Sequence, residues 1–170
     1  KKAAIRVAHN LLLSHGLAVR AFRETGLEGK IGVSLNLKPV YPATDSGEDA
    51  RIAEVQDVIK NRWFLDPILR GEYPIARSQE FIEDYGLPDV KDGDLAAISI
   101  PIDFLGVNYY SRDLVAFDSS MPLNARRVRP EDSDYTTMGW EIYPQGLEDL
   151  LTKLKDNYGY VDVYVTENGV

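Results

Sequence analysis

Residues 161–168 read VDVYVTEN, an apolar strand pattern that ends at the carboxylate of Glu167. Residues 103–110, DFLGVNYY, and residues 30–37, KIGVSLNL, show the same design, because in both an apolar run finishes in polar side chains. Polar groups that gather at the carboxyl ends of several parallel strands are typical of the active-site end of a (β/α)₈ barrel. The three stretches therefore predict an α/β fold that is part of a (β/α)₈ TIM barrel, in preference to a small doubly wound domain.

Side chains alternate between the two faces of a strand, so each of these segments should present one face with a polar tip. Tyr109 has the opposite parity to Tyr110 and should pack outward against helices. The predicted polar-tipped faces comprise Gly32, Ser34 and Asn36; Gly106, Asn108 and Tyr110; and Val163, Val165 and Glu167.

The segments between the strands carry the helical period, and alternation of strands with helices favours a parallel sheet. Trp63 lies on an apolar helical stripe and should belong to the core. The first helix is apolar over so much of its circumference that it should be covered on most sides. Residues 111–144 look irregular, and so long a connection usually marks a functional loop or a small subdomain. Helices are predicted over residues 3–24, 48–69, 77–84, 93–98 and 145–156.

Composition excludes several classes of function. A formal net charge of −8 argues against a nucleic-acid partner. The chain has no cysteine, and His9 and His15 are six positions apart, so we expect no metal site. Without a glycine-rich phosphate loop, we also expect no cofactor. No apolar run is long enough to cross a membrane, and polar residues interrupt the one N-terminal stretch that resembles a signal peptide. These features favour a cytoplasmic protein.

Glu167 is the candidate catalytic group. A carboxylate at a strand tip is either a solvated or capping group or a reactive one. Tyr110, on the neighbouring strand, could donate its phenolic hydrogen to Glu167 and so orient the carboxylate and keep it ionised. Asn108 could hold a sugar hydroxyl or the same carboxylate. An ionised, oriented carboxylate is what attack on the anomeric carbon of a sugar requires.

Five motifs in this order resemble glycoside hydrolase family 1, the β-glucosidase family. The resemblance extends over essentially the whole chain and implies barrel strands five to seven of eight. The motifs are AHNLLLSHGLAVRAFRE (8–24), KIGVSLNLKPVYPA (30–43), DFLGVNYY (103–110), TTMGWEIYPQGL (136–147) and TENG (166–169).

The resemblance implies a retaining β-glycosidase and a role for each of five residues. Glu167 matches the nucleophile that forms a covalent glycosyl-enzyme, and Tyr110 matches the tyrosine that hydrogen-bonds it. Asn108 matches a residue that lines the sugar site. Trp140 matches an aromatic wall of the aglycone subsite, although a packed loop tryptophan is the alternative. Asn36 matches a polar residue near the aglycone.

The family's acid/base glutamate lies in an Asn-Glu-Pro motif, and this sequence contains no Glu-Pro pair. We expect that motif just upstream of residue 1 and the family's last strand after residue 170. Residues 1–170 are therefore predicted to form one segment of a partial barrel domain, inactive alone and completed by other segments of the same barrel. The alternatives are a non-catalytic or engineered barrel fragment that assembles or binds carbohydrate, and an unrelated small α/β protein.

Overall fold

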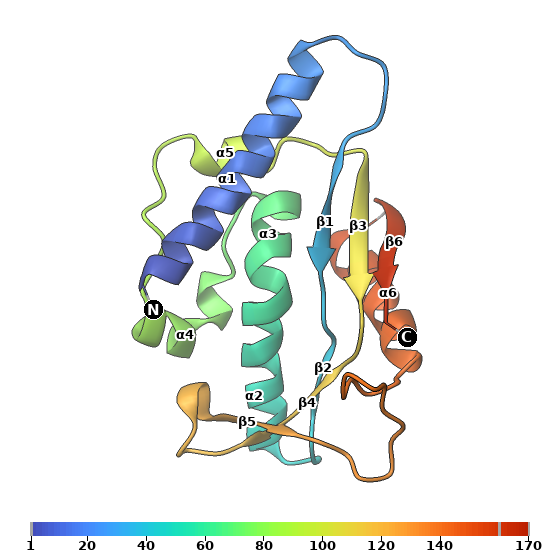
Figure 1. Cartoon of the computed structure of the whole chain (residues 1–170). Coiled ribbons are helices and arrows are strands. Elements are labelled where there is room, and N and C mark those ends of the chain that lie inside the picture. Colours follow the sequence, from blue (N-terminus) through green and yellow to red (C-terminus); the bar gives the residue numbers. More distant parts are fainter. Residues whose placement is uncertain (1, 160, 170) are drawn as a thin grey trace.

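The structure, a computed structural model, describes residues 2–159 and 161–169 (Figure 1). The main elements are α1 (Lys2–Glu24), β1 (Gly32–Asn36), β2 (Val40–Pro42), α2 (Gly47–Asp57), α3 (Trp63–Arg70), α4 (Gln79–Tyr85), α5 (Asp94–Ile98), β3 (Phe104–Tyr109), β4 (Asp113–Phe117), β5 (Ala125–Val128), α6 (Gln145–Tyr158) and β6 (Asp162–Asn168).

The three predicted strands form one parallel sheet in the order β1-β3-β6. Helices lie between β1 and β3 and between β3 and β6 along the chain, as parallel pairing requires. All three strands run in the same direction and finish at the same edge of the sheet (Figure 1). The polar tips of the strands therefore meet at one edge of the sheet, as the sequence predicts.

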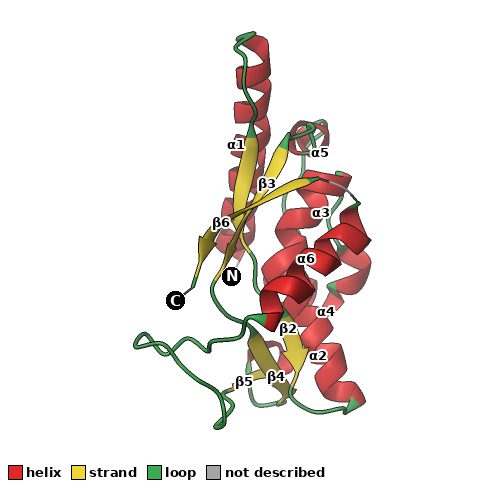
Figure 2. Cartoon of the chain, turned by 90° about the vertical axis from the view of Figure 1, so that its right-hand side faces the viewer, coloured by secondary structure: helices red, strands yellow, loops and turns green. Residues whose placement is uncertain are grey.

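One face of this sheet, the outer face, packs against helices. Leu105, Val107 and Tyr109 of β3 are at most 3% exposed and contact Leu150 and Leu154 of α6. Figure 2 shows α3 and α6 on the same side of the strands. Tyr109 thus packs outward, as predicted. This burial of apolar side chains is the main force that fixes the sheet on its helices.

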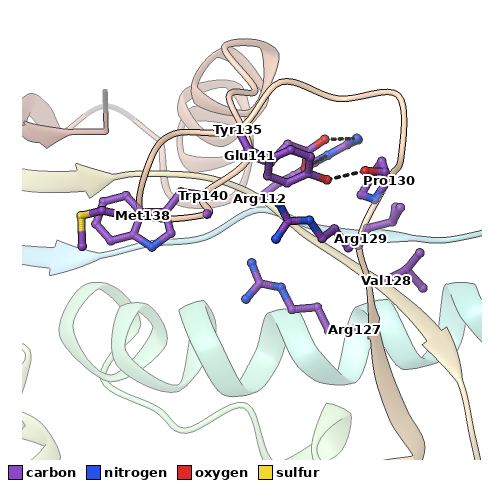
Figure 3. Close-up of a pocket in the computed structure, with 11 residues that line it drawn as sticks. Arg112, Arg127, Val128, Arg129, Pro130, Tyr135, Met138, Trp140 and Glu141 are labelled. Carbon is purple, nitrogen blue, oxygen red and sulfur yellow. Dashed lines mark hydrogen bonds and ion pairs between the residues drawn. The ribbon is translucent and has the colours of Figure 1, made fainter.

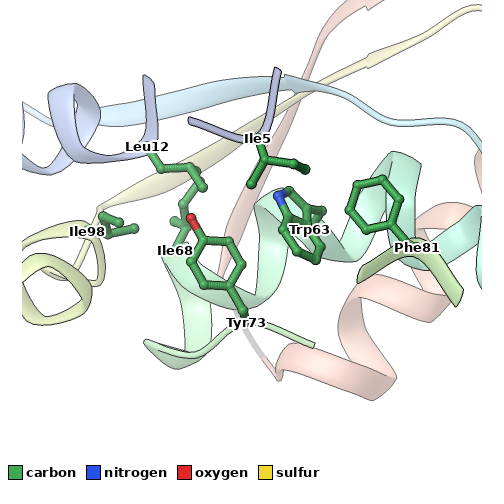
Figure 4. Packing of buried hydrophobic residues seen from close by; sticks show 7 residues of the cluster. All are labelled: Ile5, Leu12, Trp63, Ile68, Tyr73, Phe81 and Ile98. Atoms are coloured by element: carbon green, nitrogen blue, oxygen red, sulfur yellow. The ribbon is translucent and has the colours of Figure 1, made fainter. Parts of the chain in front are cut away.

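A second apolar cluster joins α1, α3, α4 and α5 and holds the helical layer together (Figure 4). Trp63 is 2% exposed and lies at its centre, against the rings of Tyr73 and Phe81, which confirms the predicted core role. His9 accepts or donates a bond with the Tyr73 hydroxyl at 2.9 Å and bonds Asp94 at 3.0 Å. This buried histidine therefore has a structural role.

The predicted helix over residues 48–69 is interrupted. A π-helical turn, Val58–Arg62, separates α2 from α3. Asn61 on this turn exchanges two hydrogen bonds of 2.8 Å with the backbone of Lys38, just beyond β1. The π-helical turn therefore orients the buried Asn61 amide toward the end of β1, and the two hydrogen bonds fix the position of that strand end. π-Turns of this kind are frequent at functional sites.

Residues 111–144 are less irregular than predicted. They contain β4 and β5, which form a second, mixed sheet with β2. The sequence signal was weak because both strands are short and carry charged residues, Asp113 at the start of β4 and Arg126 and Arg127 in β5. So long a connection was expected to be a functional loop or a small subdomain, and residues 111–144 contribute two of the three strands of this second sheet.

The prediction that α1 is covered on most sides is wrong for the described residues. Only one row of the helix, with Ile5, Leu12 and Val19, is buried, and its neighbours are α5 and α3. Val7 and Leu11 on the other side are 56% and 62% exposed. The helix has the apolar surface of a covered helix, but the described elements pack on one side of it.

Candidate active site

Glu167 lies at the end of β6, and a β-bulge decides which way it faces. The register pairs Leu105 with Val163 and Val107 with Val165, but then shifts so that Asn108 pairs with Glu167. Paired residues on neighbouring strands share a face of the sheet. The prediction that Val163, Val165 and Glu167 share one face is therefore wrong, because the extra residue of the bulge reverses the alternation. The correction aligns Glu167 with Asn108.

Asn36, Asn108 and Glu167 consequently form a row across the three strand ends. Their face, the inner face of the sheet, is opposite the helix-covered outer face. The Thr166 hydroxyl, at the bulge, donates to Oδ1 of Asn108 at 2.5 Å. This bond leaves the Asn108 amide nitrogen as a donor. Asn36 and Glu167 are exposed and Asn108 is half-buried.

Two glycines allow the strand tips to approach each other. A Cβ on Gly106 would come within 2.2 Å of the Ser34 Oγ, and one on Gly169 within 2.6 Å of the Tyr110 carbonyl oxygen. The Gly169 N–H also donates to the Tyr109 carbonyl at 2.8 Å. This bond fixes Gly169 to the end of β3. Glu167, two residues earlier, is thereby held at the tip of the neighbouring strand, β6.

Tyr110 follows β3, and its ring lies 5.1 Å from the Trp140 ring, centroid to centroid, with a tilt of 54°. Among the described residues, no hydrogen bond joins the Tyr110 hydroxyl to Glu167 and no cation pairs with Glu167. The structure therefore brings Tyr110 together with Trp140, and the proposed bond to Glu167 stays a prediction.

Trp140 is half-buried at the end of a tight turn in the loop before α6. The Thr136 N–H donates to the Trp140 carbonyl at 2.8 Å, and the Trp140 N–H donates to the Thr136 hydroxyl at 3.1 Å. Gly139 has a φ of +79°, which other residues rarely adopt. The TTMGW segment thus forms a closed turn that holds the indole next to Tyr110.

Arg112 and Glu141 form a buried ion pair next to these residues, which sequence reasoning missed. Arg112 donates from Nε and Nη2 to the two Glu141 oxygens at 3.0 and 2.8 Å, and its guanidinium lies 3.6 Å from the centre of the Tyr143 ring. The hydrogen bond from Arg112 holds the pKa of Glu141 below its usual range. The sequence signal that could have revealed this pair is the position of its two charges, one shortly after NYY and one directly after Trp140.

Asp113 is a second missed carboxylate, on β4, with a side chain 5% exposed. Lys60 donates to it, and Lys38 and Arg127 lie 3.4 and 2.9 Å from its Oδ1. Burial alone would raise the pKa of Asp113, but the bond from Lys60 and the charges of the three cations outweigh it, and the pKa is lowered. One buried carboxylate is therefore shared by three cations.

A cleft of about 390 Å³ opens between Trp140 and β5 (Figure 3). Its charged lining consists of Arg112, Arg127, Arg129 and Glu141, and its apolar lining includes Trp140 and Met138.

The described part of the chain contains no group of three or more His, Cys, Asp or Glu side chains that could hold a metal ion. It also contains no helix of the length and apolarity that a membrane span needs.

Comparison with known proteins identifies relatives of the whole stretch. The model of the family described as Glycosyl hydrolase family 1 matches residues 1–170. Beta-glucosidase A of Acetivibrio thermocellus is 40% identical over 174 residues, which cover 99% of this chain and 38% of that protein. Beta-glucosidase A of Thermotoga maritima is 43% identical over 167 residues, covering 98% of this chain and 37% of that protein.

Solved structures agree with these sequence matches. A crystal structure of a beta-glucosidase from Exiguobacterium marinum superimposes with a TM-score of 0.93 at 38% identity, over 99% of this chain and 39% of that one. The chain thus spans about two fifths of the length of the relatives it matches. Its fold is part of a (β/α)₈ TIM barrel, which confirms the fold class predicted from the strand tips.

Proposed function

Because the chain belongs to glycosyl hydrolase family 1, we propose that it supplies the nucleophilic half of a retaining β-glycosidase of the β-glucosidase type. Residues 1–170 act as one segment of a partial barrel domain. The substrate is a terminal β-linked sugar, and the reaction needs no metal or cofactor. The acidic composition and the lack of cysteine support action in the cytoplasm.

The observation that carries this proposal is the register at the strand tips. Glu167 pairs with Asn108, which pairs with Asn36, at the carboxyl ends of three parallel strands. This is the edge at which barrels of this fold bind and convert their substrates. Within residues 2–159 and 161–169, no layer of helices covers the inner face, so a sugar ring could reach the carboxylate.

The chemistry follows from an ionised carboxylate in this position. Glu167 attacks the anomeric carbon as the bond to the aglycone oxygen breaks, and a second carboxylic acid protonates that oxygen. Water then hydrolyses the glycosyl-enzyme, with the second group now acting as base. In a retaining enzyme the two carboxyl groups lie about 5–5.5 Å apart. The second group belongs to a part of the barrel outside residues 1–170.

The neighbours of Glu167 have separate roles in the proposal. The Asn108 amide nitrogen donates to a sugar hydroxyl or to the nucleophile, since Thr166 occupies its oxygen. Tyr110 donates to Glu167 once substrate and the rest of the barrel are in place, because catalytic hydrogen bonds often tighten only then. Trp140 forms a wall of the aglycone subsite, and Asn36 contributes a polar group on the same side.

The segment alone should be inactive. Parallel sheets are normally covered on both faces, whereas the inner face here exposes Ser34, Asn36 and Tyr164. Within the described residues β1 and β6 are also unpaired at their outer edges, and α1 exposes an apolar side. Complementary segments of the same barrel account for all three features. We call the whole barrel that carries this segment the complete enzyme.

Covalent trapping tests the proposal. The complete enzyme is incubated with a 2-deoxy-2-fluoro β-glucoside that has a good leaving group, digested, and analysed by tandem mass spectrometry. The expected result is one fluoroglucosyl group on Glu167. A label on another residue, or turnover without a trapped intermediate, would show that Glu167 is not the nucleophile.

A further inference from the structure

The cleft beside Trp140 is cationic in a protein whose formal net charge is −8. Three arginines and one glutamate line it. The acidic residues of the same loop, Glu131, Asp132 and Asp134, do not line it. A local excess of positive charge in an acidic protein attracts anions to one place on its surface.

Two of the four charged groups neutralise each other. Arg112 binds both oxygens of Glu141, and Ser133 donates to the same carboxylate at 2.8 Å. Arg112 and Glu141 are 15% and 6% exposed. This pair is therefore a finished structural unit and contributes little net charge to the cleft.

Arg127 and Arg129 keep donors for a ligand. Arg127 uses Nε to bind Asp113, which it shares with Lys38 and Lys60, and its side chain is 59% exposed. The Arg129 guanidinium lies 3.8 Å from the centre of the Tyr135 ring, and no carboxylate among the described residues pairs with it. Figure 3 shows both side chains extending from β5 and the loop after it toward Trp140. A guanidinium presents a planar fork that matches a carboxylate.

The opposite wall of the cleft is apolar and connects to the strand tips. Trp140 lines the cleft and also contacts the Tyr110 ring, which follows β3. Met138, 72% exposed, extends the same wall. The indole is thus shared between the cleft, which the two arginines line, and the surroundings of Tyr110, the residue after β3.

We propose that this cleft binds the aglycone of the β-glucoside and selects a flat aromatic ring that carries a carboxylate. The ring stacks on Trp140, and the carboxylate binds Arg127 and Arg129. The assignment rests on the proposed function, because it treats Trp140 as part of the aglycone subsite. Arg127 and Arg129 are specificity-determining residues in this account and take no part in bond breaking.

The test compares two substrates with the same leaving-group oxygen in the complete enzyme. They are 4-nitrophenyl β-D-glucoside and its analogue with a carboxylate at ring position 3. Each is assayed with the wild type, R127Q, R129Q and the double variant. The matched control is R126Q, because Arg126 is also an exposed arginine of β5 but pairs with Asp118 and does not line the cleft.

The double variant should lower kcat/KM for the acidic substrate about tenfold relative to the neutral one, mainly through KM, and each single variant should give part of this loss. R126Q should leave the ratio of the two substrates unchanged within about twofold. An unchanged ratio in the double variant would overturn the inference while leaving the proposed function intact.

A binding arm keeps the two proposals separable. Calorimetric titration compares 4-nitrobenzoate with 4-nitrobenzamide, which has the same ring without the charge. Preference for the benzoate that disappears in the double variant supports the site even if neither glucoside is hydrolysed, a result that would reject only the glycosidase proposal. Equal binding of the two ligands to the wild type would overturn the inference.

Discussion

The two faces of the parallel sheet contrast sharply. On the outer face, Leu105 and Val107 are completely buried against helices. On the inner face, Asn36 and Glu167 are exposed, and no cation among the described residues pairs with Glu167. The carboxylates of Glu141 and Asp113 differ from that of Glu167, because both are buried and paired with cations. The two structural carboxylates thus have cationic partners within the chain. Glu167 is instead positioned by the register of β6, which places it in a row with Asn108 and Asn36.

The largest effect should come from the inner face. Replacing Glu167 by Gln in the complete enzyme should lower kcat at least about 10⁴-fold, because an amide cannot act as the nucleophile. The free energy of unfolding should change little, since this side chain is exposed. Steady-state assays together with urea unfolding measure both quantities.

The control for that substitution is Asp162→Asn at the other end of β6, where Asp162 forms an exposed pair with Lys30. It removes the same charge from the same strand and should leave kcat within about twofold. Substantial activity in Glu167→Gln, or an equal loss in Asp162→Asn, would reject the special role of the strand tip.

The outer face should respond in the opposite way. Leu105→Ala removes a completely buried side chain and should lower the free energy of unfolding of the complete enzyme by about 3 kcal/mol. KM should stay the same, because the residue faces the helices. Asn108→Ala, three positions along β3, is the matched comparison and should change KM and kcat more than stability. A loss of stability that is larger for Asn108→Ala would contradict the assignment of the faces.

The buried ion cluster gives a pH-dependent prediction. Asp113→Asn should lower the free energy of unfolding by about 2 kcal/mol at pH 7, a value reduced from that of a fully buried pair because Lys38, Lys60 and Arg127 are partly exposed. Since the folded-state pKa is lowered, the stabilisation is present above the unfolded-state pKa, near 4, and is lost as pH falls through the folded-state pKa.

Urea unfolding from pH 3 to pH 7 measures this effect. The stability difference between wild type and Asp113→Asn should shrink as pH falls below about 4. Glu54→Gln, which breaks an exposed pair with Arg77, should cost less than about 1 kcal/mol across the range. A difference for Asp113→Asn that is constant with pH would show that the ion cluster does not stabilise the fold through its charge.

The smallest effect is expected at Tyr110. Tyr110→Phe removes the hydroxyl proposed to orient Glu167 and should lower kcat about tenfold, the scale of one hydrogen bond to a charged group. The ring should keep its contact with Trp140, so the KM for aryl glucosides should change little. A variant with unchanged kcat would remove Tyr110 from the catalytic machinery.

Much of the fold could be predicted from the sequence because local patterns specify it. The strands, the parallel sheet and the outward position of Tyr109 followed from alternation and element order. The bulge at Thr166 could not be predicted, because one extra residue in a strand leaves the apolar character of the segment unchanged. It places Val163 and Val165 on the face opposite Glu167, whereas Glu167 lies on the face of Asn108. The pairs of Arg112 with Glu141 and of Asp113 with three cations were also missed, because their partners are 14 to 75 positions apart.

The site itself was predicted by resemblance more than by pattern. A strand-tip carboxylate alone leaves a solvated group and a catalytic one equally open. The structure added the direct pairing of Asn108 with Asn36 and with Glu167, and it places Val163 and Val165 on the opposite face. The expected hydrogen bond from the Tyr110 hydroxyl to Glu167 is not formed between the described residues and stays a prediction.

The most direct test of the central claim is a distance. If Glu167 is one half of a two-carboxylate site, a crystal structure of the complete enzyme should place a second carboxyl group, from outside residues 1–170, about 5–5.5 Å from its carboxylate across the inner face. A separation of about 6.5–9.5 Å would instead indicate an inverting mechanism without a covalent intermediate. If no carboxyl group lies within about 9.5 Å of Glu167, the assignment of Glu167 as the nucleophile is contradicted.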